Sequence, residues 1–458
     1  MYIIDFDRPC HVHFIGIGGI SMSGLAEILL QEHFTVSGSD AKESPLTLHL
    51  IDNGATVFYG QKAENIIDGI DVVVYTAAIH EDNPEFMEAK RQNLPMLSRA
   101  ELLGQLMKNY EMPIAISGTH GKTTTTSMMS HILLDGELDP TISVGGILKA
   151  IGGNIRVGRS EYFVTEACEY TNSFLHFFPK IGIILNIDAD HLDFFKDLDD
   201  IRNSFRKFAQ LLPEDGALII NSDIEHLSAI TEGLVCKVIT FGGASADYSF
   251  TDVEHDDHGN TSFTVVKYGR PSERISLSVG GDHNIYNALS VIAAADLLQI
   301  STEHIQKGLH AFHGTDRRFQ YKGEVNGITV IDDYAHHPTE IAATLTAAAN
   351  YPHRELWCIF QPHTYTRTKS LFPEFAQALS KAQHLIMADI YAARETDTLG
   401  VSSEQLAQAA KDLGCDAVYI PSFEAIEAFV LENCKKGDLL ITMGAGDVVN
   451  IGEHLLEK

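Results

Sequence analysis

The stretch from Ile114 to Thr124 most constrains the fold, because it places a phosphate-type loop directly after a short apolar strand. A helix-compatible run then continues through Leu134. Backbone N–H groups of such a turn point at an anion, and the lysine reaches the outer phosphates. The residues expected to contact the phosphates are Gly118, Thr119, His120, Gly121, Lys122, Thr123 and Thr124. Ile116 replaces the first glycine of a standard P-loop, and the alternative is a ligand-free turn.

A second glycine cluster follows the apolar strand that begins at His11 and precedes a helix through Leu30. Ser21 occupies the third glycine position of the dinucleotide fingerprint, which weakens a standard NAD site. A strand, a glycine turn, a helix and an acid after the second strand still predict a nucleotide cradle. The alternative is a Rossmann-like turn without a ligand. The residues expected to bind the diphosphate and ribose are Gly16, Gly18, Gly19, Ser21, Ser39 and Asp40.

Composition excludes several classes of protein. The 458 residues carry a formal net charge of −29, which argues against nonspecific nucleic-acid binding and against an anionic membrane surface. No apolar run approaches the ~20 residues of a membrane span, and the first residues lack the basic region of a signal peptide. The six cysteines are scattered without a Cys-x-x-Cys pair. This pattern predicts a protein of the reducing cytoplasm.

Apolar strands alternate with helical patterns along most of the chain, which predicts an α/β fold with mostly parallel sheets. Three separate strand-and-turn starts predict three domains, and we place them at 1–107, 108–314 and 315–458. The first and third should be Rossmann-like, and the second should resemble a P-loop ATPase. Residues 248–279 alternate apolar and polar side chains between glycine turns, which predicts an antiparallel insert in the middle domain.

Two side chains of the predicted middle domain follow apolar strands and are candidates to bind metal, namely Glu166 and His191. With Thr123 they form the expected Mg²⁺ ligands, because functional residues gather at the carboxyl ends of parallel strands. Asp190 and Asp193 are expected to orient His191 or to cap the next helix.

Asparagines and basic residues supply the remaining candidates. Asn284 and Asn287 lie three apart at a helix start, where they either read adenine or, for Asn284, cap the helix. Arginine and histidine then cluster around further apolar strands of the third predicted domain, a composition that suits phosphate or carboxylate recognition. The candidates there are Arg317, Arg318, His336, His363 and Arg367, with surface salt bridges for Arg317 and a cap role for Asp333 as the alternatives.

In this order, these motifs resemble the Mur ligases, the ATP-dependent amide-forming enzymes of peptidoglycan assembly. The resemblance rests on Gly-Thr-His-Gly-Lys-Thr (118–123), Glu166, Asn186 with Asp190-His191, His283-Asn284 with Asn287, and Arg318. It is strongest with the alanine-adding branch, through residues 16–24, 332–340 and 360–368. Ser21, Thr364, Cys168 and Tyr170 depart from the usual pattern of that branch.

The resemblance implies ATP and two Mg²⁺ ions as cofactors, and UDP-N-acetylmuramate and L-alanine as partners. It implies catalytic roles for Lys122, Glu166, His191, His336 and Arg367, and substrate contacts for His336, His363 and Arg367. It also places the UDP-sugar in the first domain, ATP in the second and amino-acid contacts in the third. The alternatives are a tripeptide-recycling ligase of the same family, a nicotinamide-dependent oxidoreductase, and an inactive nucleotide-binding protein.

Overall fold

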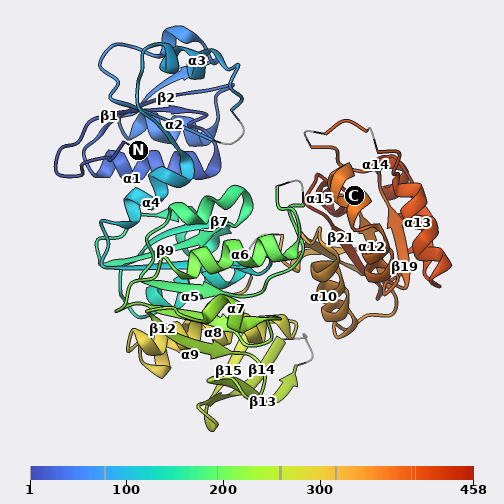
Figure 1. Cartoon of the computed structure of the whole chain (residues 1–458). Helices are drawn as coiled ribbons and strands as arrows, with labels where there is room; N and C mark the ends of the chain where they lie inside the picture. Colours follow the sequence, from blue (N-terminus) through green and yellow to red (C-terminus); the bar gives the residue numbers. More distant parts are fainter. Residues whose placement is uncertain are drawn as a thin grey trace. The chain divides into compact units, whose positions relative to one another are not determined.

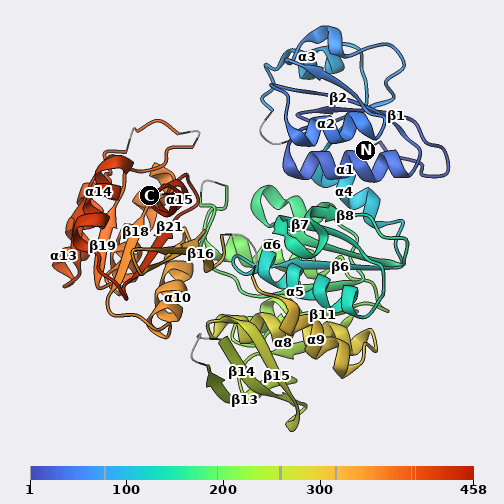
Figure 2. The ribbon, with the colours of Figure 1, turned by 180° about the vertical axis from the view of Figure 1, so that it is seen from behind.

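The computed structural model describes residues 2–76, 79–192, 194–256, 260–314, 317–393, 395–397 and 399–457. The chain forms two compact units. Unit 1 contains Met1–Ile187, Arg202–Thr240 and Ala293–His304, and unit 2 contains Asp188–Ile201, Phe241–Ile292 and Ile305–Lys458. Figures 1 and 2 show the helices and strands from opposite sides.

The first sheet has the order β3-β2-β1-β4-β5, and all its pairings are parallel. Its strands are β1 (His11–Ile15), β2 (Thr35–Asp40), β3 (Thr56–Tyr59), β4 (Val72–Tyr75) and β5 (Met96–Ser98). Its helices are α1 (Ile20–Gln31), α2 (Pro45–Asp52), η1 (Ala63–Asn65), α3 (Pro84–Arg91) and α4 (Arg99–Met107). The strand order reverses between β1 and β4, where open α/β sheets bind ligands.

The middle sheet has the order β15-β14-β13-β12-β11-β10-β6-β9-β7-β8. Its first strands are β6 (Met112–Ser117), β7 (Thr141–Leu148), β8 (Gly153–Arg156), β9 (Tyr162–Ala167), β10 (Ile181–Ile184) and β11 (Ala217–Asn221). They are followed by β12 (Lys237–Phe241), β13 (Tyr248–His255), β14 (Asn260–Lys267) and β15 (Arg270–Gly280). The helices are α5 (Lys122–Asp135), η2 (Lys149–Ile151), η3 (Tyr170–His176), α6 (Leu198–Ala209), α7 (Leu227–Thr231), α8 (His283–Leu297) and α9 (Thr302–Ala311).

The third sheet has the order β16-β17-β21-β18-β19-β20 and lies in unit 2. Its strands are β16 (Gln320–Val325), β17 (Ile328–Asp333), β18 (Leu356–Phe360), β19 (His384–Met387), β20 (Asp416–Tyr419) and β21 (Leu439–Met443). The helices are α10 (Pro338–Ala349), α11 (Tyr365–Ser370), α12 (Phe372–Leu379), α13 (Ser403–Asp412), α14 (Phe423–Asn433) and α15 (Val449–Leu456). Only β16 pairs antiparallel among the described strands of this sheet.

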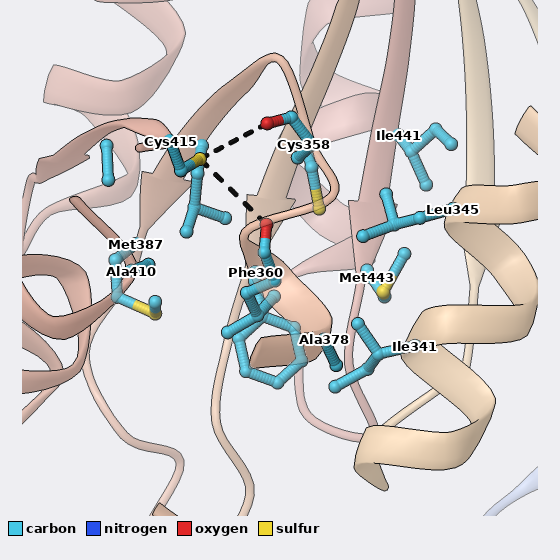
Figure 3. Packing of buried hydrophobic residues seen from close by; sticks show 14 of the residues in the cluster. Ile341, Leu345, Cys358, Phe360, Ala378, Met387, Ala410, Cys415, Ile441 and Met443 are labelled. Carbon is cyan, nitrogen blue, oxygen red and sulfur yellow. Dashed lines mark hydrogen bonds between the residues drawn. The ribbon is translucent and has the colours of Figure 1, made fainter. Parts of the chain in front are cut away.

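The core of the third sheet shows why its strands read as apolar runs. Phe360, Cys358 and Ile441 are fully or almost fully buried between helices, as Figure 3 shows. Burial raises the pKa of the Cys415 thiol to about 11, so this cysteine packs as a small neutral side chain. All six cysteines of the chain are free. No helix among the described residues is long and apolar enough to cross a membrane.

The predicted α/β class is confirmed by these three sheets. The strand predicted from Ile181 to Ile187 ends at Ile184, because the backbone beyond it turns into the loops that carry the polar candidates. Strands β13, β14 and β15 pair antiparallel, as the alternation over 248–279 predicts. The domain boundaries stay a prediction, and residues 315–316 at the second boundary lie outside the described residues, as does Asp193.

Candidate functional site

In unit 1, the loop between β6 and α5 is clamped by one asparagine. Asn186 Oδ1 accepts the N–H of His120 at 2.8 Å, and Asn186 Nδ2 donates to the carbonyl of His120 at 3.1 Å. Gly118 and Gly121 have φ of +144° and +82°, values that glycine adopts without strain. Gly121 is the N-cap of α5 and brings no side chain to its first N–H groups. These donors are therefore available to an anion.

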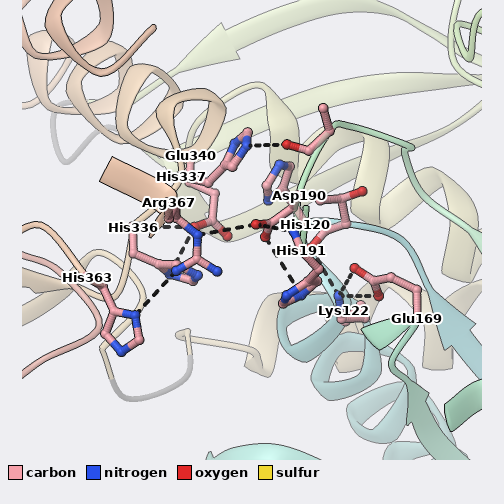
Figure 4. A network of polar contacts seen from close by, with 12 residues as sticks. His120, Lys122, Glu169, Asp190, His191, His336, His337, Glu340, His363 and Arg367 are labelled. Atoms are coloured by element: carbon pink, nitrogen blue, oxygen red, sulfur yellow. Dashed lines mark hydrogen bonds and ion pairs between the residues drawn. The ribbon is translucent and has the colours of Figure 1, made fainter. Parts of the chain in front are cut away.

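Lys122 folds back over this loop and pairs with a carboxylate (Figure 4). Its Nζ donates to the carbonyls of Gly118 and Thr119 at 2.5 and 3.0 Å, and lies 3.0 Å from Glu169 Oε2. Burial disfavours the charged amine, but the carboxylates of Glu169 and Glu166 outweigh it and raise the pKa of Lys122. The lysine is therefore fully charged at neutral pH and placed at the phosphate loop.

Two adjacent glycines of β7 lie against Glu166 and Thr123. The N–H of Gly145 donates to Glu166 Oε1 at 2.5 Å, and a Cβ on Gly145 would lie 2.8 Å from Glu166 Oε2. A Cβ on Gly146 would lie 3.3 Å from Thr123 Cγ2. The absence of side chains at Gly145 and Gly146 thus leaves space beside Glu166 and Thr123.

This pair of oxygen donors fits a hard cation. Within the described part of the chain, no group of three or more His, Cys, Asp or Glu side chains could hold a metal alone. Mg²⁺ commonly binds through one or two carboxylates and completes its shell with substrate phosphates and water. Glu166 and Thr123 beside a phosphate loop match that donor set.

The first glycine turn, also in unit 1, is tied to the end of β2. Asp40 Oδ2 accepts the N–H of Gly18 at 2.8 Å, and a Cβ on Gly18 would lie equally close to that oxygen. Ser39 is buried and donates to Glu85 Oε2 at 2.5 Å. In this structure Asp40 and Ser39 shape the turn, whereas their contacts with a ribose stay a prediction. Ser21 accepts a hydrogen bond from Arg99 at 3.0 Å.

In unit 2, the segment that carries His191 is hydrogen-bonded to residues that follow two strands of the third sheet, β17 and β18. Arg367 Nε donates to Asp190 Oδ1 at 3.2 Å, and His337 Nε2 lies 3.2 Å from the carbonyl of Ala189 (Figure 4). Burial opposes the charge on Asp190, but Arg367 and two histidines hold its pKa well below the usual range. Asp190 Oδ1 also accepts the N–H of His191, whose φ is +54°.

The histidines predicted in the third domain meet around the same arginine. His363 Nδ1 lies 3.3 Å from Arg367 Nη1, and the rings of His336 and His363 are 6.1 Å apart. Burial lowers the pKa of His336 to about 4, helped by Arg367 and opposed by Glu340. His336 is therefore neutral at pH 7. Its Nδ1 faces the carbonyl of Tyr334 at 3.0 Å and carries the proton, which leaves Nε2 as an acceptor.

The asparagine candidates of α8 contact each other. Asn287 Nδ2 donates to Asn284 Oδ1 at 3.1 Å, and Asn284 Nδ2 donates to the carbonyl of Gly280 at 2.7 Å. The helix begins at His283, so Asn284 lies inside it rather than at its cap. Arg318 Nη1 lies 3.5 Å from Glu340 Oε1.

The structural alternatives for Arg317 and Asp333 are wrong. Arg317 pairs with the buried Asp332, so its bridge is not a surface one. The N-cap of α10 is His337, whereas Asp333 accepts the backbone N–H groups of Phe319 and Ala335.

Sequence reasoning missed the roles of Glu169 and Asn186. Glu169 is almost fully buried and neutralises Lys122, a contact that depends on how η3 folds back after β9. The only signal was a second glutamate three residues after Glu166. Asn186 was part of a motif, but its bonds to the loop backbone become visible only in the fold.

Comparison with known proteins gives three family matches in order along the chain. Residues 11–111 match the Mur ligase family catalytic domain, 116–295 the Mur ligase middle domain, and 317–446 the Mur ligase glutamate ligase domain. Proteins named UDP-N-acetylmuramate–L-alanine ligase from Lachnospira eligens and Agathobacter rectalis are 59% and 60% identical. Each alignment covers 100% of both chains.

Two solved structures resemble the chain over nearly its whole length. A UDP-N-acetylmuramate–alanine ligase from Thermotoga maritima is 30% identical with a TM-score of 0.81. A murein peptide ligase from Psychrobacter arcticus is 26% identical with a TM-score of 0.71. Both alignments cover 98% of each chain.

Proposed function

Because this chain belongs to the Mur ligase family, we propose that it joins L-alanine to the lactyl carboxylate of UDP-N-acetylmuramate at the expense of ATP. The observation that carries the proposal is the identity of 59–60% over the full length to proteins named for that reaction. The charged Lys122 on a phosphate loop supports the nucleotide half of it.

The proposed reaction has two steps. The lactyl carboxylate attacks the γ-phosphorus of ATP, ADP leaves, and an acyl phosphate forms. The amine of L-alanine then attacks the acyl carbon, inorganic phosphate leaves, and the amine loses its proton. Since a carboxylate must approach a polyphosphate, catalysis consists of positioning and charge neutralisation, and no protein nucleophile is needed.

In the proposed site Lys122 contacts the β- and γ-phosphates, and the N-terminus of α5 holds their oxygens. Thr123, Glu166 and His191 are the proposed Mg²⁺ ligands, with two ions in total. When bound, Mg²⁺ would supply positive charge to the phosphates and to the substrate carboxylate. Asn284, Asn287 and Arg318 are the proposed contacts with the rest of ATP.

The amino acid is proposed to bind near His336, His363 and Arg367. Arg367 can hold a carboxylate through its fork of N–H groups, although one face of that fork already serves Asp190. The neutral His336 presents Nε2 as an acceptor that can orient an amine. We also propose a cytoplasmic location, for which six free cysteines are the support.

Phosphate release from ATP tests the proposal directly. We expect release only when UDP-N-acetylmuramate, Mg²⁺ and L-alanine are all present, with the amide product detected by mass spectrometry. Release that requires the tripeptide instead of L-alanine would assign the chain to the recycling branch. NADH binding without any ATP hydrolysis would support an oxidoreductase and overturn the proposal.

A further inference from the structure

Arg99 lies at the edge of the first sheet where ligands bind, but the motifs above give it no role. It is the first residue of α4 and directly follows β5. The turn at Gly16 follows β1, and Asp40 ends β2 in the same parallel sheet. Carboxyl ends of parallel strands share one edge, so Arg99 belongs to the edge that carries the predicted diphosphate cradle.

The guanidinium of Arg99 is in an electrostatically unfavourable place as the chain stands. Its Nη1 donates to Ser21 Oγ at 3.0 Å, and Ser21 is the second residue of α1. A helix N-terminus is positive and disfavours a cation, and the first turn of α1 contains no acidic residue. Among the described residues no carboxylate lies within ion-pairing distance of Arg99. A half-buried cation therefore lies at a positive helix end without an ion-pair partner among the described residues.

Two groups at the end of β9, Glu166 and Cys168, act electrostatically on Arg99. Helix α4 packs against η3, which follows β9, and a Cβ on Gly104 would collide with the carbonyl of His176. Burial lowers the pKa of the Arg99 guanidinium, while Cys168 and Glu166 oppose this effect. The guanidinium thus lies near both the glycine turn and the proposed metal ligand. All of these residues belong to unit 1.

We infer that Arg99 binds an anionic group of the sugar nucleotide, as a substrate-binding residue of the proposed function. UDP-N-acetylmuramate has two such groups, the diphosphate and the lactyl carboxylate. Either group would supply a negative charge that both Arg99 and the N-terminus of α1 could bind. A guanidinium also suits these groups, because its planar fork donates two parallel hydrogen bonds to a phosphate or carboxylate.

Calorimetric titration of the full chain tests the inference with two probes. UDP-N-acetylmuramate carries both anionic groups, and UDP-N-acetylglucosamine carries only the diphosphate. We expect Arg99→Gln to raise the Kd for UDP-N-acetylmuramate by about tenfold to a hundredfold, the range for a lost hydrogen bond to a charged group. An equal loss for both probes assigns Arg99 to the diphosphate, and a loss confined to UDP-N-acetylmuramate assigns it to the carboxylate.

The controls separate this inference from the proposed function. Arg91→Gln removes an exposed arginine of α3 that pairs with Glu88, and it should bind both probes like the wild type. Wild-type affinity of a folded Arg99→Gln variant for both probes would overturn the inference but leave the proposed function intact. Failure of the wild type itself to bind UDP-N-acetylmuramate would instead overturn the proposed function.

A conservative variant covers the case in which Arg99→Gln does not fold. Arg99→Lys keeps the charge but loses the fork, so its Kd should rise by about threefold or more. If it is the only folded variant, unchanged affinity for UDP-N-acetylmuramate overturns the inference. A thermal unfolding curve without ligand establishes for each variant whether it is folded.

Discussion

Lys122 Nζ lies 3.0 Å from Glu169 Oε2, so the lysine of the phosphate loop has an anionic partner before any nucleotide arrives. Only 15% of the lysine side chain and 2% of the glutamate side chain are exposed. Removing only one partner of so buried an ion pair destabilises the fold strongly, because the remaining charge has no partner and is still shielded from water.

The variant Lys122→Ala should therefore lose both turnover and stability. We expect turnover to fall by at least about a hundredfold, since the proposed contact of the Lys122 charge with the phosphates is gone. The free energy of unfolding should fall by about 3 kcal/mol, because Glu169 is left unpaired. Adding Glu169→Gln should restore much of the stability measured in urea but none of the turnover. Loss of UDP-sugar binding in a folded Lys122→Ala variant would contradict the assignment of that substrate to the first domain.

Gly145→Ala should lower turnover by displacing Glu166. The added methyl group would lie 2.8 Å from Glu166 Oε2, so the carboxylate has to move. Steady-state rates over a Mg²⁺ titration should show a raised Mg²⁺ requirement. Gly153→Ala is the matched control, because a Cβ there meets nothing closer than 4.0 Å. Equal rates for the two variants at every Mg²⁺ concentration would contradict the proposed role of Glu166 as a Mg²⁺ ligand.

His191→Ala should reduce turnover most at low Mg²⁺, with partial recovery as the Mg²⁺ concentration rises. The reason is that a lost ligand weakens metal binding, which mass action can offset. The rate is measured at saturating ATP and UDP-N-acetylmuramate. Turnover equal to that of the wild type at limiting Mg²⁺ would exclude the ligand role.

The ion pair of Asp190 and Arg367 should make the free energy of unfolding fall as the pH is lowered. The pKa of Asp190 is lowered in the folded chain, so its contribution is complete above the unfolded pKa of about 3.9 and is lost as the pH falls toward the lowered value. Arg367→Gln should therefore be less stable than the wild type at pH 7, and the difference should shrink as the solution is acidified. Urea unfolding at a series of pH values measures it. A difference independent of pH would mean that packing, not charge, accounts for the loss.

Burial of the neutral His336 should lower the free energy of unfolding in mild acid. Its pKa is about 4 in the folded chain and about 6.5 when unfolded, so between these values the unfolded chain binds more protons. Stability therefore rises with pH across this window, and His336 accounts for about 2–3 kcal/mol of the change. His336→Gln should lose less stability between pH 6.5 and 4 than the wild type. His13, whose pKa is also about 4, remains in both chains and cancels in the comparison.

The sequence predicted the parts of the fold that depend on local pattern. Apolar runs such as 217–221, 356–360 and 439–443 form strands with those bounds, because buried parallel strands need continuous apolar residues. It did not predict β7 and β8, whose residues contain glycines and polar side chains. The two glycines of β7, Gly145 and Gly146, are explained by their approach to Glu166 and Thr123, which no local pattern reveals.

The site residues also divide into those that local sequence motifs identify and those that only the fold reveals. Motifs identified Lys122, Arg367 and His336, because their chemistry and their position after strands are visible in the sequence. Their partners Glu169 and Asp190 could not be assigned in this way, since those contacts join segments that are far apart or fold back irregularly. Thr171 and Asn172 in η3, for example, both have positive φ, and the N–H of Asn172 bonds back to the carbonyl of Glu169.

The clamp of Asn186 on both the N–H and the carbonyl of His120 has a consequence for how a nucleotide is received. Because the side-chain amide of Asn186 fixes this backbone in the folded chain, the turn is ordered during folding and loses little further conformational entropy when a nucleotide binds. The association rate of the nucleotide should therefore not depend on a closing motion of this loop.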